Sequence, residues 1–456
     1  MNAMRALLPV AVVLSMSSAA YAAPSAEEIS QLGSKLTPWG AEKAGNADGS
    51  IPAYTGGMTT PPANFDKSKP GWRPNPYPQD KSILRINAAN VEQHKDKLSA
   101  GTIALIKKFS SFYVDVYPTR RSVGYPQEFL DNTVKNASRC SMINDGLGID
   151  TSNGCGFGLP FPLPKNGLEA MWNHDARYRG AAFLIKNSVG LYVKPSGDVV
   201  NTYNANSYRG WGFYDTTKKI PETFYTYRYE YYGPTRLNGN VNVTFDILAD
   251  SERRSWGYSP ATRRVRMSPD SSADTPVSQM GGAMVFDEDQ LFSGKKDRYD
   301  WKLVGKKEMY IPYNNYRFQY SDSKDSACSE KAKFTAGHPK PDCVRWELHR
   351  VWHVQATLKD GKRHIYSKRD LYFDEDSYSD GLSDNYDHAG NLYRVNLQIG
   401  SPLYDLPAAA ITDNLIIDMI SGVYGFSGME NGEYRPVPVM PANQLNAESM
   451  NRRVLH

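Results

Sequence analysis

Three segments beyond residue 220 alternate aromatic or apolar residues with other residues at a period of two. The segment 223–233 reads TFYTYRYEYYG and places Tyr225, Tyr227, Tyr229 and Tyr231 at every second position. Because successive side chains of a strand point to opposite faces, four phenol rings are predicted on one side of a sheet. Segments 240–247 and 351–358 show the same period. One apolar and one polar face per strand are typical of an antiparallel sheet that is covered on one side only.

The first part of the chain lacks this alternation and predicts helices. Ser25 and Glu28 form a capping-box pattern for a helix that runs to about residue 36. Residues 88–109 predict a second helical segment, which Gly101 is expected to divide, and shorter helices are predicted at 127–137 and 166–177. We therefore expect an α+β fold in a single domain, 23–456, with about 23–180 mostly helical or irregular and about 181–456 mostly strands.

The first 22 residues have the features of a secretory signal peptide. Arg5 precedes an apolar run at 6–14, and the small-residue pattern at 20–22 predicts cleavage after about Ala22. The best later candidate for a membrane span, 408–420, is interrupted by Asp413 and Asp418, so no spanning helix is predicted. The 53 Lys and Arg nearly balance the 49 Asp and Glu, which argues against nucleic acid as a partner. We expect an exported, periplasmic protein.

The four cysteines fall in two pairs with equal spacing. Cys140 and Cys155 form the first pair, and Cys328 and Cys343 form the second. In an exported protein, an even number of cysteines predicts disulfides, and local pairing is the least demanding of the three connectivities. A zinc site is the competing interpretation, but CxxC spacing is absent. We expect two local disulfides and no metal.

Several sequence blocks resemble a known family. The hairpin RRSWGYSPATRRVR (253–266) resembles one in the periplasmic lipoprotein carriers LolA and LolB. A closer resemblance is to the domain of unknown function 1329 family, often called outer-membrane lipoprotein-sorting proteins. Its hallmarks are similar to LTPWGAEKAGNADGSIPAYTGG (36–57), DVYPTRRSVGYP (115–126), YDWKLVGKKEMYIPYNNY (299–316) and HIYSKRDLYFDED (364–376).

The resemblance implies a LolA/LolB-like fold, in which a curved antiparallel sheet forms an incomplete, half-open barrel around a hydrophobic cavity and helices act as a lid. It implies no catalytic residues and no cofactor. Members tend to be encoded near large exporters and outer-membrane proteins, so such a protein is an expected partner.

In a half-open barrel the concave face is both core and cavity wall. The tyrosine stripe can therefore be plain core or a surface that meets an amphiphile; we expect the cavity wall, because four hydroxyl groups in a closed core would each need a partner. The residues expected to line a ligand cavity are Tyr225, Tyr227, Tyr229, Tyr231, Val241, Val243, Phe245, Ile247, Trp352 and Val354.

Arginines in the 253–266 hairpin offer contacts to an anionic head group, because guanidinium forks fit phosphate oxygens. The alternative is a solvated hairpin with cross-strand charge pairs. The residues concerned are Arg253, Arg254, Arg263, Arg264 and Arg266.

Other polar clusters predict no chemistry. His349 and His353 lie in a strand-like segment, which would hold them apart, and are expected at the surface or rim. The acidic run 374–376, with Asp380 and Asp384, lacks the glycine spacing of a calcium loop and is expected to form a solvated turn.

We therefore expect a non-catalytic periplasmic carrier or chaperone that binds a lipid, acyl chain or lipoprotein in a half-barrel cavity. One alternative is a carbohydrate-binding or polysaccharide-modifying envelope protein, since exposed Tyr and Trp stack on sugars. Another is a structural adaptor of an exporter.

Overall fold

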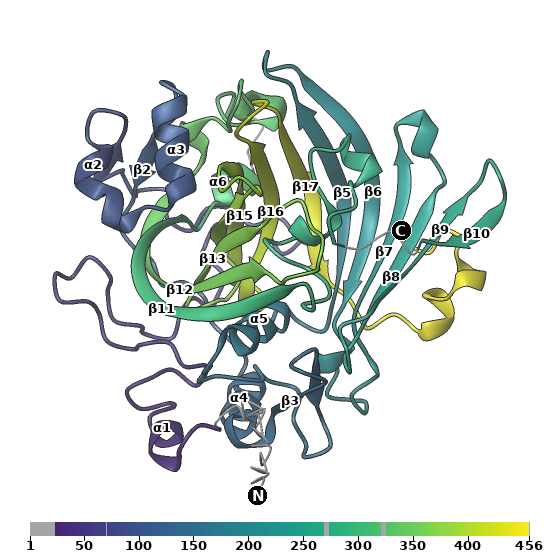
Figure 1. Ribbon diagram of the computed structural model, residues 1–456, viewed down its shortest axis with the longest axis horizontal. Helices are drawn as coiled ribbons and strands as arrows, with labels where there is room; N and C mark the ends of the chain where they lie inside the picture. The colour runs from purple at the N-terminus through teal and green to yellow at the C-terminus, as the bar shows by residue number, and fades with distance from the viewer. Residues whose placement is uncertain (1–22, 70, 269–272, 321–324, 456) are drawn as a thin grey trace, which may run out of the picture.

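Most strands of the computed structural model join one large curved sheet (Figure 1). The structure describes residues 23–69, 71–268, 273–320 and 325–455, so the predicted signal peptide lies outside the described residues. The strand order is β1-β2-β12-β13-β14-β15-β16-β17-β5-β6-β7-β8-β9-β10, with β11 also paired to β12. The bounds are β1 Leu84–Ile86, β2 Val114–Val116, β5 Ala182–Val193, β6 Val199–Gly210, β7 Thr223–Gly233, β8 Val241–Ile247, β9 Arg253–Ser259, β10 Arg264–Met267, β11 Tyr299–Pro312, β12 Trp346–Leu358, β13 Lys368–Asp374, β14 Gly381–Tyr386, β15 Leu392–Leu403, β16 Ala408–Asp418 and β17 Tyr424–Pro436.

The sheet is an incomplete barrel, as predicted. Its long strands pair antiparallel, and β10 pairs with β9 at one end of the order while β11 pairs with β12 near the other, so the sheet does not close. The predicted strand at 223–233 is β7, and 241–247 forms β8. A separate two-stranded sheet contains β3, Ser141–Ile143, and β4, Gly148–Asp150.

The helices are short. α4 (Gln127–Arg139) and α5 (Gly167–Asp175) confirm two predicted helices, and Asn166 caps α5 by accepting the amide of Glu169. The others are α1 Ala26–Ser30, α2 Val91–His94, α3 Ala100–Lys108 and α6 Tyr316–Gln319.

Two helix boundaries differ from the predictions. α1 has the expected capping box but ends at Ser30, ahead of a left-handed Gly33 with φ of 81°. The break inside 88–109 falls before Ser99, whose hydroxyl caps α3, while Gly101 lies within that helix. A Cβ on Gly101 would approach Asp384 Oδ1 to 2.2 Å, so this glycine permits close packing instead of ending the helix.

Both faces of the sheet are covered, which corrects the prediction of one solvated face. α5 packs on β11 and β12 inside the curve, and the C-terminal segment lies outside β8 and β9 (Figure 1). We call the side toward α5 the concave face, the opposite side of β5–β9 the convex face, and residues 437–455 the C-terminal strap.

Both predicted disulfides are present. Cys140 is bonded to Cys155 and Cys328 to Cys343. In the described part of the chain, no helix is both long and apolar enough to cross a bilayer.

Candidate functional site

The four tyrosines of β7 form a continuous row on the concave face. Neighbouring rings of the row lie 5.6 to 5.9 Å apart between centroids, and Tyr225 stacks on Trp211 at 4.9 Å. Tyr225 and Tyr231 are each only 6% exposed, whereas Tyr227 and Tyr229 are half-buried. The rings therefore pack mainly on one another and on neighbouring aromatic residues.

The concave face is largely filled. Met171 and Trp172 of α5 pack into its core, and the segment 277–284 packs over β5 and β6. The cavity beside Tyr227, Tyr229 and Tyr231 has a volume of only about 80 Å³. Binding pockets for small molecules measure roughly 300 to 1,000 Å³. Among the described residues, the cavity beside the tyrosine row is thus smaller than a ligand-binding pocket.

The predicted residues of β8 lie on the opposite face from the tyrosines. The register pairs Tyr227 with Thr244 but Arg228 with Val243, so Val241, Val243 and Phe245 point to the convex side. There Val241 and Val243 pack against Met450 of the strap. The prediction that these residues and the tyrosines line one cavity is wrong, because alternation separates them. Ile247, which follows a register shift, lines a concave cavity with Tyr225.

The two β12 residues that were predicted to line the cavity, Trp352 and Val354, pack in or against the core. Val354 is fully buried in the cluster that contains α5. Trp352 is half-buried, and the Lys306 ammonium lies 4.6 Å from its ring centroid. Neither residue lines any of the cavities described here.

A ligand-sized cavity lies between the convex face and the C-terminal strap. It has a volume of about 470 Å³, and we call it the strap pocket. Its polar lining is sparse. The lining residues are Tyr208, Gly210, Gly212, Pro221, Thr223, Thr226, Phe245, Trp256, Val439, Met440, Ala442, Leu445, Asn446 and Ala447.

Among these residues, only Phe245 was predicted to line a cavity. The apolar residues Val439, Met440 and Leu445 close to the C-terminus are the sequence signal that a segment there packs on the sheet. The sequence does not indicate which strand these residues contact, because Tyr208 of β6, which packs against them, lies more than two hundred positions earlier.

Two polar residues of β7 hold the strap in place. Arg228 is fully buried; its Nε donates to Glu230 Oε1 at 2.8 Å, and its terminal nitrogens donate to the carbonyl oxygens of Gln444, Ser449 and Arg452. The carboxylate of Glu230 in turn accepts the amides of Val454 and Leu455. The polar side of β7 is thus a set of anchors for the chain terminus.

The arginines of the 253–266 hairpin do not form one cluster. Arg253 is buried and makes a bidentate ion pair with Asp246, at 2.7 and 2.8 Å. Arg254 lies on the other face of β9, exposed beside Glu252. Arg263, Arg264 and Arg266 are exposed.

The acidic run at 374–376 is buried, which corrects the prediction of a solvated turn. Asp376 pairs bidentately with Arg121, both oxygens at 2.7 Å, and His349 is only 1% exposed, so it is not a surface histidine. His353 is half-buried, 2.9 Å from Asp370. Burial disfavours the charged form of His349, but hydrogen bonds that its ring donates to Asp374 and Glu347 raise the pKa of His349 to about 10.

This buried cluster could offer metal ligands. Atoms of His349, Asp374 and Asp376 lie within 4.8 Å of one another. Arg121 already neutralises Asp376, and His349 is charged next to Asp374, so ion pairs account for the arrangement. Its effect is to tie the segment around Arg121 to the strands.

Comparisons with known proteins agree over most of the chain. A family model described as "Protein of unknown function (DUF1329)" matches residues 85–451. The Uncharacterized protein PA3922 of Pseudomonas aeruginosa is 40% identical over 420 residues, covering 90% of this chain and 89% of that protein.

Solved structures give weaker matches. A putative outer membrane lipoprotein-sorting protein domain from Vibrio parahaemolyticus is 14% identical with a TM-score of 0.43, over 63% of this chain and 98% of that one. A DUF1329 family protein from Desulfovibrio piger is 14% identical with a TM-score of 0.42, over 62% and 97%. A LolA superfamily protein from Nitrosomonas europaea is 10% identical with a TM-score of 0.36, over 62% and 99%.

Proposed function

The chain belongs to the DUF1329 family of proteins of unknown function, and from this premise we propose that it is a non-catalytic periplasmic carrier that shelters an apolar chain in the strap pocket. The observation that carries the proposal is the volume of about 470 Å³ behind walls of aromatic and aliphatic side chains. Each methylene that leaves water for such walls contributes about 0.8 kcal/mol. An acyl chain is the ligand class that gains most from this site.

The construction of the strap allows the pocket to open. Arg228 and Glu230 hold the end of the strap, from Gln444 onward, through buried hydrogen bonds. Nearer β17, the amide of Met440 donates to the Tyr208 hydroxyl at 2.9 Å, at the pocket wall. Displacing the segment 437–443 would widen the entrance while the anchors stay in place.

An exported location fits the chemistry of the chain. Disulfides persist in oxidising compartments such as the periplasm, and two are formed here. An acyl chain that crosses this aqueous space needs a protein shelter. A lipid or lipoprotein would be the cargo, and an envelope exporter or outer-membrane protein would be the partner.

The tyrosine stripe gives little support to the carbohydrate-binding alternative. Sugar rings stack on open aromatic platforms, whereas Tyr225 and Tyr231 are buried and the row packs on itself. A pull-down from envelope extracts tests the adaptor alternative.

The proposal is tested by filling the pocket. Ala442 lies in the strap and lines the pocket mouth, while its own side chain is exposed, so Ala442→Trp adds a ring without disturbing the core. We expect the variant to bind a fluorescent fatty acid at least about tenfold more weakly, since the ring replaces several methylene contacts.

Ala261→Trp is the matched control, because Ala261 is exposed in the turn between β9 and β10 and lines none of these cavities. It should bind the probe as the native protein does. Equal binding by both variants and the native protein would contradict the strap pocket as the site. Native mass spectrometry that finds no lipid in the purified protein, together with no uptake of the probe, would contradict the carrier function itself.

A further inference from the structure

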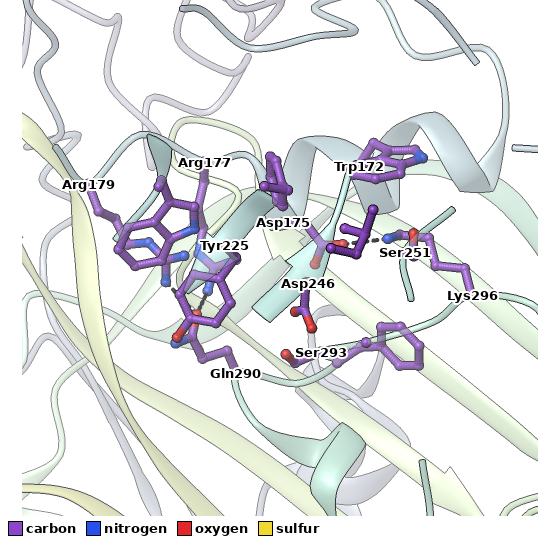
Figure 2. A pocket seen from close by; sticks show the side chains of 15 residues that line it. Trp172, Asp175, Arg177, Arg179, Tyr225, Asp246, Ser251, Gln290, Ser293 and Lys296 are labelled. Carbon is purple, nitrogen blue, oxygen red and sulfur yellow. Dashed lines mark hydrogen bonds and ion pairs between the residues drawn. The ribbon is translucent and has the colours of Figure 1, made fainter. Parts of the chain in front are cut away.

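Two buried arginines on the concave face have no acidic partner. Arg177 is 2% exposed and Arg179 is 4% exposed. In the described part of the chain, neither makes an ion pair within 4 Å. Both guanidinium groups instead donate to the single side-chain oxygen of Gln290, as Figure 2 shows. Arg177 also donates to the His174 carbonyl oxygen and the Ser379 hydroxyl, whereas Gln290 is the one acceptor of Arg179 among the described residues. Neutral acceptors alone are poor counterparts for two buried charges.

The nearby carboxylates are already paired. The cavity beside these arginines is also lined by Asp175 and Asp246. Lys296 lies 2.5 Å from Asp175, and Arg253 makes the bidentate pair with Asp246. The charged side chains that line this cavity therefore leave a net positive charge, which comes from the guanidinium groups of Arg177 and Arg179.

An adjoining cavity contains further buried charged residues that, in the described part of the chain, lack a close ion-pair partner. It shares Arg179 and Gln290 with the first cavity and adds Arg209 and Asp413. Arg209 lies 3.6 Å from Asp289, a long ion pair. Asp413 accepts the amide of Met429 and makes no ion pair within 4 Å among the described residues.

Donors without partners converge on the same space. Arg179 Nε and the Tyr225 hydroxyl are buried and make no hydrogen bond. Only Nη1 of Arg179 is used, for Gln290, so the edge formed by Nε and Nη2 is free within the described residues. The Trp211 ring, 4.0 Å from the guanidinium carbon, holds the plane of this group. Figure 2 shows Arg177, Arg179 and Tyr225 gathered around Gln290.

We propose that Arg179, with Arg177 and Tyr225, binds a carboxylate in this concave cavity. The guanidinium edge matches the two oxygens of a carboxylate, and Tyr225 supplies a further donor. The cavity volume of about 30 Å³ admits a group of a few atoms and excludes a nucleotide or a sugar phosphate. The carboxylate belongs either to a free small acid or to the end of a longer acid. This site is separate from the strap pocket, which lies on the other face of the same strands.

The protonation behaviour of the arginines supports this assignment. Burial, aided by the charge of Arg209, lowers the pKa of Arg179 to about 10. Burial and the charge of Arg179 lower the pKa of Arg177. A bound anion would remove this penalty, because an opposite charge favours the protonated guanidinium.

Calorimetric titration of the native protein with acetate, at constant ionic strength, tests the proposal. We expect saturable binding to one site, and a loss of about tenfold or more in Arg179→Gln, since a hydrogen-bonded charge pair is removed. Tyr225→Phe keeps the charge and deletes one donor, so binding should weaken by about threefold. Arg139→Gln, at the exposed end of α4, should bind acetate like the native protein.

Competition experiments show which kind of acid supplies the carboxylate, and whether the site prefers a carboxylate to other anions. Displacement of acetate by laurate would support the end of a longer acid, and binding of acetate without such displacement would support a free small acid. Equal competition by chloride would overturn the carboxylate assignment. The proposal is also overturned if acetate does not bind, or if Arg179→Gln and Arg139→Gln bind it equally. Should Arg179→Gln fail to fold, undiminished binding by Tyr225→Phe overturns the role of the free donors.

Discussion

The two faces of β7 differ both in their side chains and in the size of the cavities beside them. Its concave side carries four tyrosines, yet only small cavities of about 30 and 80 Å³ lie beside them. Its convex side carries Thr226, Arg228 and Glu230, yet it borders a cavity of about 470 Å³. The difference teaches that a ligand-sized space depends on the segment that covers a strand more than on the side chains of the strand itself.

The covering segments explain the difference. On the concave face, Met171, Trp172 and Met280 are large side chains that fill the space above the sheet. On the convex face, the strap lines the pocket with Val439, Met440 and Leu445, and also with the small residues Ala442, which is exposed, and Ala447. Small side chains on the cover leave unfilled volume, and the anchors at Arg228 and Glu230 keep the strap in place over it.

The largest expected effect comes from breaking the convex anchor. Arg228→Ala should lower the free energy of unfolding by about 3 to 5 kcal/mol, because Glu230 is left as a buried unpaired charge and three strap carbonyls lose their donor. Urea unfolding measures this change. Arg254→Ala, on the same face but exposed, should cost less than about 0.5 kcal/mol. Similar small losses in both variants would show that the strap is not anchored as described.

A concave double substitution should affect stability and spare ligand uptake. Tyr227→Ser combined with Tyr229→Ser removes two half-buried rings from the row, and should cost about 3 kcal/mol in thermal unfolding. Fatty acid uptake should change by less than about twofold, because the strap pocket lies on the other side of the sheet. Strongly reduced uptake with unchanged stability would reverse the assignment of the two faces.

Part of the pH dependence of stability should come from Asp413 on the concave side and from Asp384 beside α3. Burial raises the pKa of Asp413, and also that of Asp384 beside α3, to about 7. Between about pH 4 and 7 the folded chain therefore holds protons that the unfolded chain releases, so the free energy of unfolding should fall as pH rises, by at most about 4 kcal/mol per group. Asp413→Asn should remove its share of the slope in urea unfolding curves. An unchanged slope in this variant would contradict the prediction.

The same pH range should leave ligand uptake nearly unchanged. Tyr208 is the one ionisable residue that lines the strap pocket, and burial raises its pKa to about 12. Uptake of a neutral apolar probe, such as a fluorescent fatty alcohol, should therefore stay constant within about twofold between about pH 5 and 9. A clear titration of uptake in this range would place the ligand beside a group of the concave face.

The strands could be predicted from the sequence, but their covers could not. The period of two located β7 and β8, because alternation persists wherever the two faces differ. The expected polar, open face is the side of β7 that carries Arg228 and Glu230, and a single charged residue gives no sign of a partner more than 200 positions away. The prediction that the acidic run is solvated was wrong for the same reason. Asp376 is buried because it pairs with Arg121, which lies 255 positions earlier in the chain.

The grouping of the predicted site residues did not follow from the sequence. Phe245 lines a cavity on the convex face and not with the tyrosines, because the relative register of β7 and β8 decides which face each residue shares. Features that depend on residues close in the sequence were predicted correctly, as for the two disulfides and the capping box of α1.

The most direct test of the central claim is a crystal structure with a fatty acid that carries bromine at the end of its chain. The anomalous signal of bromine locates the chain terminus without reference to the fold. We predict a peak beneath the strap, between Phe245, Trp256 and Leu445, in the cavity of about 470 Å³. A peak beside Tyr227 and Tyr229, on the concave face, would contradict the claim that the covering segment, and not the tyrosine stripe, makes the ligand site.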